Sequence, residues 1–142
     1  MCFNPESIDV LSTAPKLQSL IITPAPNTVA LPHIPCLQLR YFAHTLYASV
    51  EGHMRLLSET PLLETYKTEI YGSLNRFTAV PFTHNSLHRL ELCCRRSDLS
   101  LLEYLTCLAL EELSLYLCRF GALEHILFDF DNRSLDRTRI PW

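Results

Sequence analysis

Leu87-His-Arg-Leu-Glu-Leu92 and Leu110-Glu-Glu-Leu-Ser-Leu115 are two copies of one pattern, in which apolar residues recur three and five positions after a first apolar residue. Four further copies, the last two of them weaker, begin at Leu17, Ile34, Leu63 and Leu135. The starting positions 17, 34, 63, 87, 110 and 135 give sequence intervals of 17, 29, 24, 23 and 25. The last four intervals fall in the range of about 20 to 29 residues that is typical of leucine-rich repeats.

The spacing within each copy predicts a short strand, because alternate side chains of a strand point to the same side. We expect an α/β leucine-rich-repeat solenoid of about five to six repeats that forms one domain over residues 1–142, with parallel strands on the concave side and helices on the convex side. The core should include Leu90 and Leu113. The expected strands are centred on Leu20, Leu37, Tyr66, Leu90, Leu113 and Thr138.

The segments between the copies predict the crossover helices that parallel strands require. Asn4 is a good N-cap for a helix that starts at Pro5, and prolines follow the expected ends of the first two helices. The Pro-rich residues 24–35 predict an extended connection instead. The expected helices cover residues 5–13, 49–59, 97–106 and 122–130.

The outward positions of the strands form three columns on the concave face, which is the usual binding surface of this architecture. Charges alternate along these columns, so the sequence predicts cross-strand ladders Arg89–Glu112–Arg137, Lys67–Glu91 and Arg40–Glu69. The ladders serve either to relieve repulsion within the sheet or to recognise a partner. The candidate protein-binding residues are Arg40, Lys67, Glu69, Arg89, Glu91, Glu112, Ser114, Tyr116, Arg137 and Arg139.

Other classes of function find little support in the sequence. With 12 basic and 15 acidic residues and a net charge of -3, the chain carries no basic footprint for nucleic acid. No uncharged apolar stretch is long enough to cross a membrane. Cys93 and Cys94 are adjacent rather than spaced as zinc ligands, and no glycine-rich phosphate loop occurs. We therefore expect no metal, no cofactor, no catalytic residue and no enzymatic activity.

Several phrases resemble repeats of fungal F-box proteins, in which a helix that ends near Thr-Pro or Ala-Pro leads into the next Leu-x-x-Leu-x-Leu strand. They are Ser7-Ile-Asp-Val-Leu-Ser-Thr-Ala-Pro-Lys-Leu-Gln-Ser-Leu20, His53-Met-Arg-Leu-Leu-Ser-Glu-Thr-Pro-Leu-Leu-Glu64 and Leu101-Leu-Glu-Tyr-Leu-Thr-Cys-Leu-Ala-Leu-Glu-Glu-Leu-Ser-Leu115.

The resemblance implies a cytoplasmic or nuclear substrate receptor whose repeats hold a protein, while a separate F-box binds the adaptor of a cullin-based ubiquitin ligase. No F-box is visible, so we expect a fragment that lacks its F-box and N-terminal cap, and an adaptor as partner only if an F-box lies upstream. The asparagine ladder of many such repeats is also missing. The alternative is a degenerate or truncated repeat fragment that has no dedicated partner.

Overall fold

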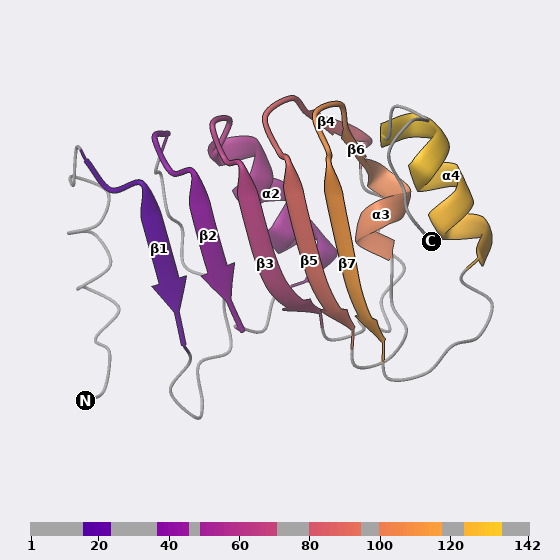
Figure 1. Ribbon diagram of the computed structural model, residues 1–142, viewed down its shortest axis with the longest axis horizontal. Helices are drawn as coiled ribbons and strands as arrows, with labels where there is room; N and C mark the ends of the chain where they lie inside the picture. The colour runs from indigo at the N-terminus through magenta and orange to yellow at the C-terminus, as the bar shows by residue number, and fades with distance from the viewer. Residues whose placement is uncertain are drawn as a thin grey trace.

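A computed structural model describes six stretches of the chain, and all structural statements below refer to them: residues 16–23, 37–45, 49–70, 80–94, 100–117 and 124–134. Within these residues the fold is α/β, as expected, with a five-stranded parallel sheet, a two-stranded parallel sheet and three helices (Figure 1). The expected helix over residues 5–13, the extended connection over residues 24–35 and the strand around Thr138 lie outside the described residues.

The large sheet follows the order of the chain. Its strands are β1 (Ser19–Ile22), β2 (Tyr41–His44), β3 (Thr65–Ile70), β5 (Arg89–Cys94) and β7 (Glu112–Leu117), and each lies parallel to the next. Ser19, Tyr41, Thr65, Arg89 and Glu112 share one register row, and their sequence intervals are 22, 24, 24 and 23. The expectation of parallel neighbours is confirmed, and each step across the sheet advances the chain by nearly the same length.

The apolar pattern explains why these segments form strands. The first apolar residue of a copy lies just before the strand, and Leu39, Leu63 and Leu87 in that position are fully buried. The second apolar residue is the inward residue of the strand, as with Leu90, which is also fully buried. Burying one such side chain stabilises the fold by about 1.5 to 3 kcal/mol. Leu113 differs from the expectation, because it is only partly buried against the edge of the core.

The second strand lies five residues later than the sequence pattern predicted. Leu37 was expected at a strand centre, but its side chain is 68% exposed in the turn before β2. The true copy is Leu39-x-x-Phe42-x-His44, which has a histidine at its third inward position. His44 is buried and its Nε2 lies 2.8 Å from the hydroxyl of Tyr66, so a hydrogen bond replaces the apolar contact. This polar substitution hid the copy from a search for apolar residues.

Three helices lie on one side of the large sheet (Figure 1). Helix α2 (Val50–Glu59) confirms the predicted range of residues 49–59, and the Ser49 hydroxyl caps it by accepting from the Gly52 amide at 3.2 Å. Helix α3 (Ser100–Tyr104) ends two residues before the predicted end at residue 106, because its chain continues as a strand, and the predicted helical residues 97–99 lie outside the described residues. Helix α4 (Glu124–Ser134) ends four residues after the predicted end at residue 130.

The small sheet was not predicted. It pairs β4 (Phe82–His84) with β6 (Leu105–Cys107) in parallel and packs beside α2 and α4. Such short strands cannot show a period in the sequence. They let the chain cross behind the large sheet in extended form where a longer helix was expected.

Backbone hydrogen bonds join the turns that lead into the strands, at the N-terminal ends of the large sheet. One carbonyl in each turn accepts two amides from the next turn along the chain, at 2.8 to 3.0 Å. The accepting residues are Gln18, Arg40, Glu64 and His88. We call this row, with Glu111 as its last member, the rim ladder.

The hydrophobic core fills the space between the large sheet and the helices. Leu56 and Leu57 from α2, Leu101 and Leu102 from α3 and Phe130 from α4 meet the inward residues of the strands there. The opposite side of the sheet carries no helix among the described residues (Figure 1). We call this side the open face. None of the helices described combines the length and the apolar character that a membrane crossing demands.

Candidate functional site

The open face consists of the strand residues that alternate with the core residues. Register places these residues in rows that run across the strands. The first row is Ser19, Tyr41, Thr65, Arg89 and Glu112, the second is Ile21, Ala43, Lys67, Glu91 and Ser114, and the third contains Glu69, Cys93 and Tyr116. The structure therefore brings seven of the ten candidate residues onto one surface: Lys67, Glu69, Arg89, Glu91, Glu112, Ser114 and Tyr116.

The predicted Lys67–Glu91 ladder and the first pair of the predicted Arg89–Glu112–Arg137 ladder are present on this face. Lys67 Nζ lies 2.6 Å from Glu91 Oε1, and Arg89 forms a 2.8 Å contact with Glu112 Oε2. The hydrogen bond that Lys67 donates to Glu91 raises the pKa of Lys67, which keeps the ammonium charged. Because these side chains are substantially solvated, each pair adds only about 0 to 1 kcal/mol to stability. The ladders fix where charges stand on the surface more than they hold the sheet together.

The predicted ladder between Arg40 and Glu69 is wrong. Arg40 precedes β2, because that strand starts later than expected, and its guanidinium pairs with Glu64 on the rim ladder. Glu69 lies at the far end of β3 opposite Cys93 and is only 9% exposed. It therefore offers little surface to a partner. Alternation along a strand predicts the direction of a side chain but not what lies over it.

Two apolar side chains stand out at opposite ends of the open face. Ile21 on β1 is 66% exposed and Tyr116 on β7 is 57% exposed. Four strand spacings of about 4.8 Å separate β1 from β7, or roughly 19 Å. The two side chains therefore form separate anchor points rather than one apolar patch. Arg137 and Arg139, the other two candidate residues, lie outside the described residues.

The rim ladder adds a charged surface that the sequence analysis missed. Arg40 pairs with Glu64, and His88 Nδ1 lies 3.6 Å from Glu111 Oε1. Beside them is a shallow hollow of about 530 Å³, lined by Glu64, Thr65, His88, Arg89, Glu111 and Glu112. The signal was present in the sequence, since the residue after the first apolar position is polar or charged in each copy that the structure shows as a strand of the large sheet.

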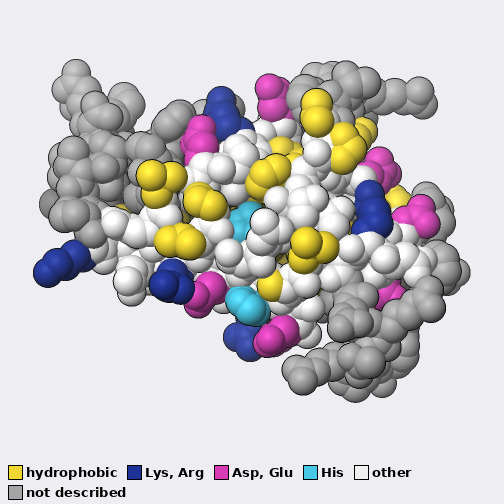
Figure 2. Space-filling view, turned by 90° about the horizontal axis from the view of Figure 1, so that it is seen from above, with side chains coloured by type: hydrophobic (Ala, Val, Ile, Leu, Met, Phe, Trp, Pro, Cys, Tyr) yellow, Lys and Arg dark blue, Asp and Glu magenta, His cyan; other side chains and the backbone are white. Residues whose placement is uncertain are grey.

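Figure 2 looks down on the N-terminal ends of the strands and shows the extent of this surface. Charged side chains, with a histidine among them, follow one edge of the view, and hydrophobic side chains gather inside that edge. The exposed leucines of the turns before the strands are Leu37, Leu62 and Leu108. The open face thus ends in a charged border beside apolar turns.

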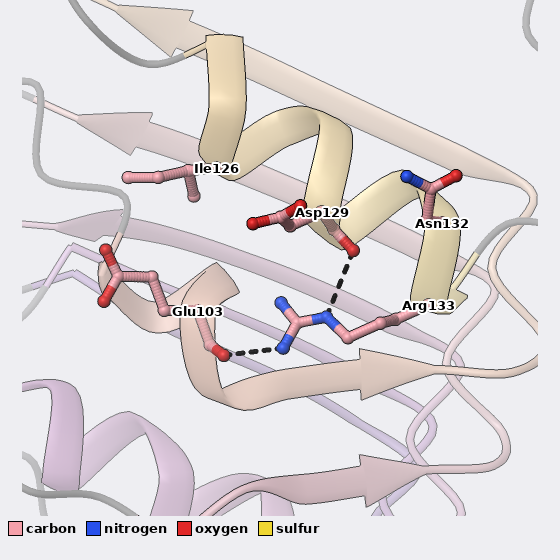
Figure 3. A pocket seen from close by; sticks show the side chains of 5 residues that line it. All are labelled: Glu103, Ile126, Asp129, Asn132 and Arg133. Carbon is pink, nitrogen blue, oxygen red and sulfur yellow. Dashed lines mark hydrogen bonds between the residues drawn. The ribbon is translucent and has the colours of Figure 1, made fainter.

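A second hollow lies between α3 and α4 and has a structural use (Figure 3). It measures about 370 Å³ and is lined by Glu103, Ile126, Asp129, Asn132 and Arg133. The Arg133 guanidinium donates to the carbonyls of Leu102 and Glu103 at 2.6 and 2.7 Å, and its Nε donates to the Asp129 carbonyl at 3.1 Å. These bonds satisfy the last carbonyls of α3 and leave the guanidinium few donors for a ligand.

The described residues contain no cluster of metal ligands, and the thiol of the buried Cys107 is protonated. They contain no group of three or more histidine, cysteine or acidic side chains arranged to hold a metal ion. Cys107 is a buried thiol, and burial raises its pKa to about 12, which keeps it protonated at neutral pH. A protonated thiol is a poor nucleophile.

Comparison with known proteins gives no further assignment: the sequence matches no protein-family model, and neither a curated protein nor a solved structure shows significant similarity to the chain.

Proposed function

We propose that the chain is a leucine-rich-repeat solenoid that binds another protein through the open face of its sheet. The observation that carries the proposal is the regular advance of five parallel strands, in chain order and in register, by a nearly constant length of chain per strand. Repeat proteins of this kind use the extended face of the sheet for binding. Among the described residues, the helices all lie on the other side of the sheet and none covers that face.

The chemistry of the open face supports a protein as the partner. Its charges are held in cross-strand pairs, and its exposed apolar side chains stand at the two edges. A partner would be selected by the positions of alternating charges, and such patterns determine specificity and association rate more than affinity. A nucleic acid would instead require an excess of basic groups.

The resemblance to fungal F-box proteins supports a more specific setting. We propose that the captured protein is a substrate of a cullin-based ubiquitin ligase, in the cytoplasm or nucleus. This role requires an F-box on the same natural polypeptide. Co-precipitation of the ligase adaptor with the natural protein tests it, and absence of the adaptor would restrict the proposal to protein binding alone.

The binding proposal is tested by exchanging one cross-strand pair. Arg89→Glu combined with Glu112→Arg keeps the possible ion pair but reverses the charges presented to a partner. We expect unchanged folding and loss of the proteins that the wild-type chain captures from its native cell extract. Arg55→Glu is the matched control, because Arg55 is exposed on α2, on the opposite side of the molecule.

The control should retain the captured proteins. If the exchanged pair retains them while Arg55→Glu loses them, the open face is not the binding surface. If the wild-type chain captures no protein, the binding proposal itself fails.

A further inference from the structure

Three buried histidines lie on or beside helix α2. The sequence contains six histidines, and His44 on β2, His53 on α2 and His84 on β4 are all buried. The imidazole of His53 stacks on that of His44 with ring centroids 5.5 Å apart. Helix α2 is thus fastened to its surroundings by side chains that can each take up a proton in the pH range of histidine titration.

The first contact that holds α2 joins one tyrosine hydroxyl to two imidazoles. The Tyr66 hydroxyl lies 2.7 Å from His53 Nδ1 and 2.8 Å from His44 Nε2. A hydroxyl has one proton, so it donates to one imidazole and accepts from the other. At least one of the two rings must therefore present an unprotonated nitrogen.

The other nitrogen of His53 lacks a partner that could accept a proton from it among the described residues. His53 Nε2 is buried and has no hydrogen-bond partner among the described residues. A buried N–H without a partner is rarer and more costly than an unpaired acceptor, so the neutral ring carries its proton on Nδ1 and donates it to Tyr66. Burial lowers the pKa of His53 to about 4. Protonation in the folded state would place a charged donor at Nε2 without a partner.

The second contact is a hydrogen bond from His84, which holds the C-terminal end of α2. His84 Nε2 donates to the carbonyl of Thr60, the C-cap residue of α2, at 3.1 Å, and His84 Nδ1 accepts from the Ser86 amide at 3.3 Å. Burial lowers the pKa of His84, and the bond to the Thr60 carbonyl opposes that shift. A second proton on Nδ1 would face the Ser86 N–H. Cys107, which pairs with His84 in the small sheet, keeps its thiol proton and supplies no compensating charge.

We propose that α2 is an acid-releasable element, in which protonation of His53 and His84 detaches the helix from the sheet while β5 and β7 remain paired. The other histidine whose side chain is described, His88, is exposed on the rim and lies beside Glu111. Release of α2 exposes Met54, Leu56 and Leu57, which are buried in the folded state. Acid thereby converts a closed core into an apolar surface on the side opposite the open face.

The direction of the pH effect follows from linkage. The pKa of His53 is lower in the folded state than the ordinary value of 6.5, so the released state binds the proton more readily. The contribution of His53 to stability is complete above pH 6.5 and is lost as the pH falls toward 4. The pKa of His53 thus differs between 6.5 in the released state and about 4 in the folded state. At a pH below both values, this difference shifts the equilibrium between attached and released helix by about 300-fold.

Hydrogen exchange of the full chain at pH 7 and pH 4.5, corrected for intrinsic exchange, tests the proposal. We expect amides of residues 50–59 to lose protection by tenfold or more at pH 4.5, while those of residues 89–94 keep theirs. Simultaneous loss in both segments would show global acid unfolding and overturn the proposal. Unchanged protection of residues 50–59 would also overturn it.

Variants assign the effect to the histidines. His53→Gln keeps an amide donor for Tyr66 but cannot titrate, so the release should require a lower pH than in the wild type. His88→Gln removes an exposed histidine and should leave the pH profile unchanged. If His53→Gln folds poorly, the imidazole titration of His53 in the wild-type chain, measured by nuclear magnetic resonance, must coincide with the release of α2. A release midpoint that is the same in His53→Gln and wild type contradicts the proposal.

Discussion

The hydroxyl of Tyr66 and the Nδ1 atom of His53 lie 2.7 Å apart across the junction between β3 and α2, in a fully buried position. Tyr66 was expected only as a weak apolar residue at a strand centre. Its ring takes that place, while its hydroxyl joins two histidines from neighbouring elements. Tyr66, His44 and His53 therefore form a polar contact inside the core.

Replacing Tyr66 by Phe tests the value of this contact. The ring would still fill its position, but ring nitrogens of His44 and His53 would lose their partner. We expect a loss of about 1 to 3 kcal/mol in the free energy of unfolding, as for other buried polar groups left unpaired. Tyr41→Phe, in a half-buried position on the open face, is the control and should change stability by less than about 0.5 kcal/mol. Equal effects of the two variants would contradict the role assigned to the Tyr66 hydroxyl.

Equivalent leucines in neighbouring copies of the pattern should differ in their contribution to stability. Leu90→Ala should cost about 2 to 5 kcal/mol, since Leu90 is fully buried between two strands. Leu113→Ala should cost less, about 1 to 2 kcal/mol, because Leu113 is only partly buried. Urea denaturation of both variants measures the difference. A larger loss for Leu113 than for Leu90 would show that the core extends beyond β7.

Arg133 should stabilise the fold through the planar arrangement of its guanidinium donors, and not through its charge alone. Arg133→Ala leaves the last carbonyls of α3 without their donor and should cost about 1 to 3 kcal/mol. Arg133→Lys should recover only part of this loss, because an ammonium cannot reproduce the planar fork. Asn132→Ala, in the same hollow, is the control. Full recovery by lysine in thermal denaturation would indicate that charge, not geometry, holds α3 to α4.

The Lys67–Glu91 pair should contribute little to folding. A double-mutant cycle with Lys67→Ala and Glu91→Ala should give a coupling energy of at most about 1 kcal/mol, because one partner is half exposed. The coupling should fall further at high salt, where exposed charges are screened. A coupling of several kcal/mol that persists in salt would mean that the pair is a structural element and weaken its assignment to partner recognition.

The regular copies of the apolar pattern were sufficient to predict much of the fold. They located β1, β3, β5 and β7, the parallel order of the strands and two cross-strand ion pairs, and the segment between two copies located helix α2. The pattern failed where a polar residue takes an inward position, as His44 does in β2, since its burial depends on a hydrogen bond to a residue of the next strand. Such a partner cannot be recognised before the strands are in register.

The candidate surface was predictable to the same degree. Register fixed the neighbours of Lys67 and Arg89, whereas Arg40 and Glu69 were misassigned because their surroundings depend on strand ends and turns. The small sheet of β4 and β6 carries no apolar period, because it follows from how the chain returns between strands, which a linear pattern does not contain. The rim ladder left a signal in the polar residue before each strand, but its hydrogen bonds depend on the register of neighbouring turns.

The rim ladder also explains how this architecture tolerates change in length. Each turn is held to its neighbours through one carbonyl that receives two amides, and this junction stays the same although the stretches of chain between successive strands differ slightly in length. Insertions and deletions can therefore accumulate behind the sheet, where the described residues form helices in some connections and short strands in others. During evolution such a chain can gain or lose a whole strand together with its connection. The spacing of the side chains on the open face stays constant when it does.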